Sequence, residues 1–166
     1  MNTMLMLAAV LAAPAALSTE TPSAPLAPVP VAEALDEFAA VCLATYPRAS
    51  RFRAAVSRSN AGYADSGDGK LWHSRRAAVR FDTARGGICE FDALLAEASD
   101  PGVIAGMVEG RVARALNAVP SRRQQGRTIV WEWRDEGAPV RVVYDFGSAL
   151  KPNQLALSIR RPAVGA

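Results

Sequence analysis

Residue types that support catalysis and metal binding are scarce in this sequence. It has one histidine, His73, and two cysteines, Cys42 and Cys89. A zinc site usually needs several His or Cys ligands, so we expect no metal and no cofactor. A Ser-His-Asp triad would have to use His73, and the nucleophile motif G-x-S-x-G does not occur. The sequence therefore predicts no catalytic residues.

Lysine and clustered charge are also scarce. Only Lys70 and Lys151 are lysines among the 19 basic residues, and the formal net charge is +3. The arginine pairs at 75–76 and 122–123 are dispersed among acidic residues. Nucleic-acid-binding proteins concentrate basic residues on one face, so we expect no nucleic-acid partner. Beyond the N-terminus, no apolar run approaches the roughly 20 residues of a membrane-spanning helix. No integral membrane segment is therefore expected after signal cleavage.

The N-terminus has the pattern of a signal peptide. The run from Met4 to Ala13 is apolar and uncharged, too short to span a bilayer, and followed by small residues that fit a cleavage site. We expect a signal peptide over 1–18, a Pro-rich linker over 19–30 and one domain over 31–163. An uncleaved membrane-attached helix is the alternative. The expected location is the periplasm or the exterior of a bacterium, as a soluble protein.

Helical periodicity predicts three helices, at about 31–45, 50–59 and 100–117. In the third, Asp100 is a capping residue and Pro101 occupies the first helical position.

Alternation of apolar and polar residues predicts five strands. They are expected at about 76–82, 87–91, 129–134, 140–146 and 155–160. Residues 63–70 are expected to form a loop, and no internal repeat is visible. The pattern indicates an α+β fold with an antiparallel sheet of about five strands and helices on one face. The predicted order is α-α-β-β-α-β-β-β.

The two cysteines give the strongest chemical prediction. In an exported chain they meet oxidising conditions, which favour a disulfide. Cys42 lies on the apolar stripe of the first helix, and Cys89 shares a strand face with Phe91, so both thiols point into one core. We expect a buried Cys42–Cys89 bond that closes a loop of roughly 48 residues. Two buried free thiols, or a redox or nucleophilic cysteine, are the alternatives, although no C-x-x-C motif occurs.

The three tryptophans are candidates for core packing or for binding. Trp131 and Trp133 alternate with Glu132 and Arg134, so the two rings should face the helices while the charged residues face solvent. The alternative is an aromatic platform that stacks on a sugar ring, a base or a peptide, helped by nearby arginines. The candidate binding residues are Trp72, Trp131, Trp133, Arg127 and Arg134.

Two short motifs resemble catalytic or metal-binding patterns. Residues Ser148 to Lys151 match the S-x-x-K of penicillin-recognising serine enzymes, but neither S-D-N nor K-T-G accompanies them. Residues Asp65 to Lys70 resemble a fragment of a calcium loop, but no closing glutamate follows. We interpret both motifs as turns.

A family resemblance follows from a few motifs. Phe38 and Cys42 form an F-x-x-x-C pattern in the first helix, Trp72 follows in mid-chain, and residues 89–91 form C-x-F. In these features, over residues 33–160, the chain resembles a set of short exported bacterial proteins of unknown function. The resemblance implies export and a paired Cys42 and Cys89, and no known activity.

These features predict an exported cell-envelope protein that binds an unidentified envelope protein or small ligand and does not catalyse a reaction. The alternative is a small envelope hydrolase or an enzyme inhibitor with an unrecognised site. A deep pocket with several inward ionisable groups would favour an enzyme. A shallow apolar groove edged by arginines would favour binding.

Overall fold

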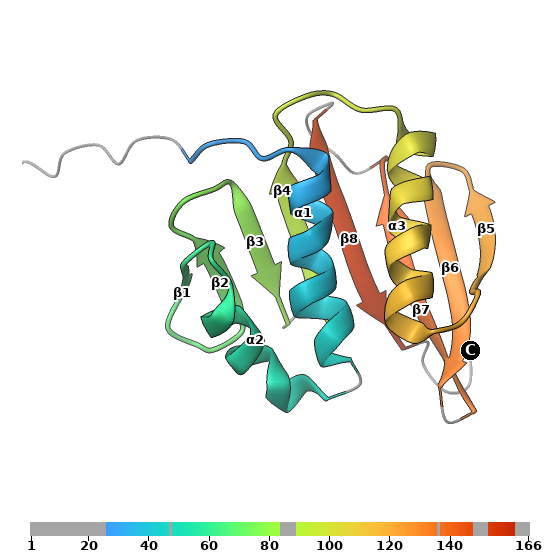
Figure 1. Ribbon diagram of the computed structural model, residues 1–166, viewed down its shortest axis with the longest axis horizontal. Helices are drawn as coiled ribbons and strands as arrows, with labels where there is room; N and C mark the ends of the chain where they lie inside the picture. The colour runs from blue at the N-terminus through green and yellow to red at the C-terminus, as the bar shows by residue number, and fades with distance from the viewer. Residues whose placement is uncertain (1–25, 47, 84–88, 136, 148–152, 162–166) are drawn as a thin grey trace, which may run out of the picture.

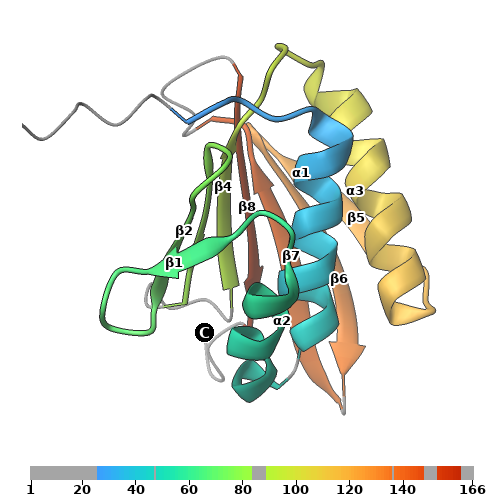
Figure 2. The ribbon, with the colours of Figure 1, turned by 60° about the vertical axis from the view of Figure 1, so that its left-hand side comes forward.

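The fold is a single antiparallel sheet with helices on one face. The computed structural model describes residues 26–46, 48–83, 89–135, 137–147 and 153–161. Within these residues the sheet has eight strands in the spatial order β1-β2-β3-β4-β8-β7-β6-β5 (Figure 1). The helices all lie on the same side of the sheet, as the rotated view in Figure 2 shows. The predicted α+β class, antiparallel sheet and one-sided helices are therefore confirmed.

The elements follow one another along the chain in two groups. The helical elements are α1 (Val31–Phe38), the π-helical turn η1 (Ala39–Leu43), the 3-10 turn η2 (Ala49–Arg51), α2 (Phe52–Arg58) and α3 (Pro101–Leu116). The first four strands are β1 (Tyr63–Asp65), β2 (Leu71–Ser74), β3 (Val79–Asp82) and β4 (Cys89–Leu94). The last four are β5 (Ser121–Gln125), β6 (Thr128–Asp135), β7 (Ala138–Asp145) and β8 (Gln154–Arg160).

The predicted strand count and element order are wrong. The sheet has eight strands instead of about five, because β1, β2 and β5 were not expected. Strand β1 has only three residues, and β5 has the polar sequence SRRQQ with every residue exposed. Neither strand shows apolar alternation. An edge strand needs no such pattern, because backbone hydrogen bonds to its one neighbour can hold it in the sheet. The sequence also predicts a hairpin loop over residues 83–87, and all of it except Thr83 lies outside the described residues.

The first helix contains a π-helical turn that the sequence did not indicate. The helical path runs through the predicted segment, but η1 interrupts the α-helical spacing and places Val41, Cys42 and Leu43 all in the core. A π turn inserts one extra residue into the helix and loosens the bonding of its carbonyls. Here the buried hydroxyl of Thr45 donates to the Val41 carbonyl at 2.7 Å. The turn thus lets three consecutive residues contact the core.

The third helix begins and ends as its sequence predicts. The Asp100 carboxylate accepts hydrogen bonds from the backbone N–H groups of Gly102 and Val103, and Pro101 is the first helical residue. Asn117 adopts the left-handed conformation at the C-terminal end. Arg111 joins α3 to α1 because its guanidinium donates to the Asp36 carboxylate at 2.9 Å.

The two halves of the chain share one order of elements. Helices precede the meander β1–β4, and α3 precedes the meander β5–β8. The halves meet at the centre of the sheet, where β4 and β8 pair antiparallel from Cys89 opposite Ile159 to Leu94 opposite Gln154. The sequence shows no repeat, so this correspondence is one of topology. The last strands of the two meanders, β4 and β8, therefore lie side by side beneath the helices.

The predicted disulfide is confirmed. Cys42 of η1 is bonded to Cys89 of β4, with a Cα–Cα distance of 5.7 Å, which is within the usual range for disulfides. Both cysteines have an exposed fraction of 0%. The bond therefore joins the first helical segment to one of the two central strands.

A short segment before α1 also lies against the sheet. Val29 is buried, its N–H donates to the Leu94 carbonyl at 2.9 Å, and its carbonyl accepts from the N–H of Ala96 at 2.8 Å. Ala27 forms a parallel bridge with Ala77. Residues 26–30, the end of the expected Pro-rich linker, thus contact the folded domain. Among the described residues, no helix combines the length and apolar composition that crossing a membrane requires.

Candidate binding surfaces

The face of the sheet that the helices leave uncovered carries charged and polar side chains. We call it the open face, and it includes the following residues that alternate with the core: His73, Arg80, Glu90, Asp92, Ser121, Arg123, Thr128, Glu132, Arg134, Arg141, Val143, Asp145, Gln154, Ala156, Ser158 and Arg160. Direct cross-strand neighbours carry opposite charges at two places, Arg80 opposite Asp92 and Arg141 opposite Glu132. Cross-strand pairs of this kind stabilise a sheet surface. The open face therefore carries several ion pairs, although Arg141 and Arg160, which also lie directly opposite each other, have the same charge.

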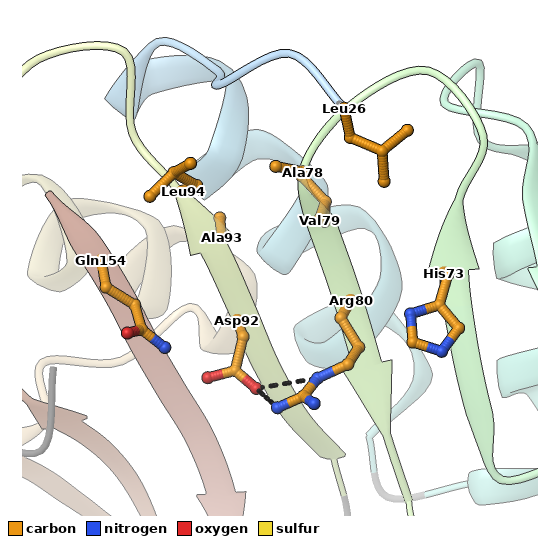
Figure 3. A pocket seen from close by; sticks show the side chains of 9 residues that line it. All are labelled: Leu26, His73, Ala78, Val79, Arg80, Asp92, Ala93, Leu94 and Gln154. Atoms are coloured by element: carbon orange, nitrogen blue, oxygen red, sulfur yellow. Dashed lines mark hydrogen bonds and ion pairs between the residues drawn. The ribbon is translucent and has the colours of Figure 1, made fainter. Parts of the chain in front are cut away.

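Two shallow hollows on the open face share part of their lining, and we call them together the groove. They have volumes of about 330 and 400 Å³, and Arg80, Asp92 and Gln154 line both. Figure 3 shows Arg80 and Asp92 pointing toward each other, with His73 on one side and Gln154 on the other. The groove passes over β8, where Ala156 is one of the lining residues. Because the Ala156 side chain is short, β8 forms the floor of the groove at this position, between longer side chains.

Charged side chains of the open face form ion pairs with one another. The Nε of Arg141 donates to Glu132 at 2.6 Å, and this hydrogen bond is the main reason that the pKa of Glu132 is lowered. Arg123 lies 3.7 Å from the same carboxylate. Arg160 contacts Glu90 at 3.5 Å. The face therefore presents fixed pairs of opposite charge on a rigid sheet.

A second surface lies at the end of the helical layer, where α3 ends. We call it the Trp133 cleft, and it is lined by Tyr46, Ala115, Leu116, Ala118, Val119, Trp133, Arg134 and Asp135, with a volume of about 510 Å³. The Tyr46 and Trp133 rings meet edge to face with centroids 5.8 Å apart. Such edge-to-face contacts are favourable between aromatic rings. The cleft is therefore shallow, walled by aromatic and aliphatic groups, and bordered by an arginine.

Hydrogen bonds fix one wall of the Trp133 cleft. The Tyr46 hydroxyl donates to the Asp135 carboxylate at 2.9 Å, and the Arg161 guanidinium donates to the Tyr46 oxygen at 3.3 Å. Arg161 also lies 5.7 Å from the centre of the Tyr46 ring and 3.7 Å from Asp135. Burial, together with the Asp135 charge, raises the pKa of Tyr46, with Arg161 opposing. The ring is thus held in one orientation.

The five candidate binding residues do not gather into one site. Trp131 is fully buried, and its indole N–H donates to Glu109 at 3.3 Å. Trp72 has an exposed fraction of 8% and packs against Phe52. Arg127 lies at the opposite end of β6, where it donates to the Phe146 carbonyl.

Only Trp133 and Arg134 of the five line the same hollow, the Trp133 cleft. The prediction that Trp131 and Trp133 face the helical side is confirmed, since Trp131 lies in the core and Trp133 packs against it.

Sequence reasoning missed two residues of the cleft. Tyr46 stands four residues after Cys42, at a spacing that predicts only the apolar stripe of the first helix, and no sequence pattern points to Val119. Val119 lies between α3 and β5 with an exposed fraction of 89%. A signal was available, because Val119 stands between the end of a helix and Pro120, where a turn exposes its residues. The position of Tyr46 beside Trp133 depends on tertiary packing and has no local signal.

The other motifs have structural explanations where the structure describes them. Asp65 accepts hydrogen bonds from the backbone N–H groups of Gly67 and Gly69, at 3.0 and 2.9 Å. The Lys70 N–H donates to Asp68, and this bond is the main cause of the lowered pKa of Asp68. These carboxylates therefore serve a turn. Among the described residues, no group of three or more His, Cys, Asp or Glu side chains is arranged to hold a metal ion. The S-x-x-K motif lies outside the described residues.

Comparison of the chain with protein-family models, with curated proteins and with solved structures found no match.

Proposed function

We propose that this is an exported cell-envelope protein that binds another protein through the open face of its sheet and has no catalytic role. The observation that carries the proposal is the eight-stranded sheet, because the helices that the structure describes all lie on one side of it. Export is supported by the apolar N-terminal run and by the buried disulfide, because disulfides persist in oxidising compartments.

The size of the open face fits a protein partner. Eight strands spaced about 4.8 Å apart, with a rise of about 3.3 Å per residue, give an area of about 700 Å². A standard protein–protein interface buries about 800 Å² on each partner. A small-molecule site is usually a concave and mostly apolar pocket, whereas the hollows on this face are shallow and lined by charged residues. The face therefore suits a broad surface contact.

The chemistry of the open face favours a different protein over a second copy of this chain. Interfaces between identical subunits are more apolar than the rest of the surface, and this face carries ion pairs such as Arg80–Asp92 and Arg160–Glu90. Paired charges on a rigid sheet give specificity through electrostatic complementarity. An inhibitor that covers an envelope enzyme would use a surface of this kind, so the inhibitor alternative is one form of the proposed binding.

The test is crosslinking in the cell envelope of the source bacterium, followed by capture of the tagged protein. Ala156→Arg fills the floor of the groove with a charged side chain, and Val103→Arg is the matched control on the exposed side of α3. We expect a partner to be captured by the original protein and by the control, but not by Ala156→Arg. Equal capture by all three proteins would refute the role of the open face. Near-UV circular dichroism shows whether each variant is folded.

A further inference from the structure

One half of the open face carries a group of arginines on four neighbouring strands. We call this group the arginine cluster, and its members are Arg123 of β5, Arg134 of β6, Arg141 of β7 and Arg160 of β8. The four strands lie side by side in the sheet (Figure 1). The side chains of Arg123, Arg141 and Arg160 have exposed fractions of 35–52%, and Arg134 is also exposed. The four guanidinium groups are therefore accessible on the same surface.

Three arginines of the cluster surround Glu132. The Nε of Arg141 donates to the Glu132 carboxylate at 2.6 Å, and Arg123 lies 3.7 Å from it. The charge of Arg134 also acts on this carboxylate, although less than the bond from Arg141, and contributes to its lowered pKa. Among the carboxylates that the structure describes, no other lies within ion-pair distance of these three guanidinium groups. One negative charge cannot neutralise three positive charges, so this surface keeps a positive surplus.

The fourth arginine adds to the surplus. Arg160 lies directly opposite Arg141 on the adjacent strand, and like charges in this position destabilise a sheet. Arg160 donates to the Ser158 hydroxyl at 3.0 Å and lies 3.5 Å from Glu90, which belongs to the strand on its other side. Folding alone does not favour two opposed arginines. A carboxylate placed between them would replace their repulsion by charge-assisted hydrogen bonds.

The surroundings of the cluster limit the kind of anion that fits. The adjacent hollow over β8 is lined by Glu90, Asp92 and Asp145. A nucleic acid or an anionic membrane surface would extend over these carboxylates and be repelled by them. The cluster itself is about 14 Å wide, since it crosses from β5 to β8. In an extended segment, alternate side chains lie on one side about 7 Å apart, so two or three carboxylates span this width.

We infer that the arginine cluster binds an acidic segment of the protein partner, in which two or three carboxylates lie within about 14 Å of one another. The inference rests on the proposed function, because the cluster is part of the open face, and it names the chemistry of the partner. Each carboxylate accepts hydrogen bonds from the planar guanidinium groups, whose geometry suits paired bonds. The rigid sheet holds the arginines in place, which lowers the entropy lost on binding.

The first experiment measures the binding of a short oligoglutamate peptide to the purified, oxidised protein. An oligoglutamine peptide of the same length is the blank. The cluster variant combines Arg123→Gln, Arg134→Gln and Arg160→Gln. It should fold, because these side chains are exposed and Arg141 keeps its bond to Glu132. We expect the dissociation constant of oligoglutamate to rise by about tenfold or more in this variant.

A control variant removes the same charge from the other side of the molecule. It combines Arg51→Gln, Arg53→Gln and Arg58→Gln, which are exposed positions of η2 and α2. The control should bind oligoglutamate within about twofold of the original protein. Equal weakening in both variants would show that net charge alone attracts the peptide, and would overturn the inference. Near-UV circular dichroism shows whether each variant is folded. If the cluster variant is not, Arg160→Gln alone should weaken binding by about threefold.

Phosphate-bearing ligands provide a second test of the same surface. Inorganic phosphate, a short DNA duplex and vesicles that contain phosphatidylglycerol are compared with oligoglutamate at the same ionic strength. We expect each to bind more weakly than the peptide. Tighter binding of any of them that the cluster variant loses would overturn the inference in favour of a phosphate ligand.

Capture from the cell envelope separates this inference from the proposed function. We expect the cluster variant to lose the partner that the original protein and the control variant capture, as Ala156→Arg does. A partner that Ala156→Arg loses and the cluster variant retains would overturn this inference and leave the proposed function intact. Equal capture by every protein would refute the proposed function, and the inference with it.

Discussion

Cys42 and Cys89 show how much of the architecture depends on single residues. The bond ties the π-helical turn to β4, which is one of the two strands at the centre of the sheet. The sequence separation is 47 residues, so the bond removes a large loop from the freedom of the unfolded chain. Because both cysteines are buried, their role is structural, and neither thiol is available for redox exchange in the folded protein.

Replacement of both cysteines by alanine should lower the free energy of unfolding by about 2–5 kcal/mol. The physical reasons are the loss of the loop constraint and the loss of packing around two buried side chains. Denaturant titration followed by circular dichroism measures the change. A reducing agent should lower the unfolding midpoint of the original protein and leave the midpoint of the double variant unaltered. An unchanged free energy in the variant would contradict a stabilising role for the bond.

Buried tyrosines predict a loss of stability in alkaline solution. Burial raises the pKa of Tyr144 to about 12, with a smaller contribution from the Asp100 charge. The pKa of Tyr63 is raised more, first by burial and then by Glu37. The ordinary pKa of both tyrosine hydroxyls is 10.0. Since the folded state keeps these hydroxyls protonated, their stabilising contribution is complete below pH 10.0 and is lost as the pH rises toward the folded pKa.

The measurement is the unfolding midpoint as a function of pH. We expect the unfolding midpoint to fall between about pH 10 and pH 12. The absorbance of tyrosinate should rise as the protein unfolds. Tyr144→Phe should reduce the steepness of this fall, because one group that titrates on unfolding is gone. A fall of equal steepness in the variant would contradict the assignment to Tyr144.

At the scale of elements, the sequence predicts those whose own side chains determine them. Helix α3 was predicted nearly to its ends because Asp100 and Pro101 form a cap that depends on local chemistry. Strands β6, β7 and β8 were predicted because one face of each is apolar and buried and the other face is mostly polar. Edge strand β5 was missed because backbone bonds to β6, and no apolar pattern of its own, hold it in the sheet.

The candidate site was less predictable than the fold. Trp133 and Arg134 were named from their place in a strand, but the walls that complete their cleft come from elements far away in the sequence. Tyr46 reaches the cleft because η1 and α3 lie side by side on the sheet. The groove of the open face likewise requires β3, β4 and β8 to be neighbours. Strand order depends on long-range pairing, which one-dimensional periodicity does not report.

The two tryptophans of β6 should differ in their contribution to stability. Trp131 is fully buried, so Trp131→Ala should lower the free energy of unfolding by about 3–5 kcal/mol. Trp133 is half-buried at the end of the same strand, so Trp133→Ala should lower the free energy of unfolding clearly less. Denaturant titrations of the two variants measure the difference. Equal losses would show that Trp133 is as important to the core as Trp131.

At the scale of the whole molecule, one sheet unites two similar halves. The first half supplies α1, α2 and a four-stranded meander, the second supplies α3 and another, and the pairing of β4 with β8 joins them over six residues of each strand. The aromatic core of the first half reaches this junction, since Phe91 of β4, which lies opposite Leu157 of β8, contacts both Phe38 of α1 and Phe81 of β3. With its helices on one side, the joined sheet has a single broad open face, which neither half would offer alone.

The segment before α1 completes this sheet, and its contribution can be measured by truncation. Val29 buries its side chain, and its backbone bonds link the segment to the chain at Leu94 and Ala96. Proteins that begin at Leu26 should therefore unfold at the same denaturant concentration as proteins that begin at Ser18. Those that begin at Val31 should lose about 2–4 kcal/mol, from the burial of one valine and the loss of two or three hydrogen bonds.

The first residue of the mature chain tests both export and the role of this segment. Cleavage after the proposed signal peptide leaves Val29 in place, and mass spectrometry of protein from the periplasm should show a chain that begins between residues 16 and 19. An intact Met1 on protein recovered from the cytoplasm would contradict export. A mature chain that begins after Val29 would contradict a structural role for this segment, because the cell would then use the protein without it.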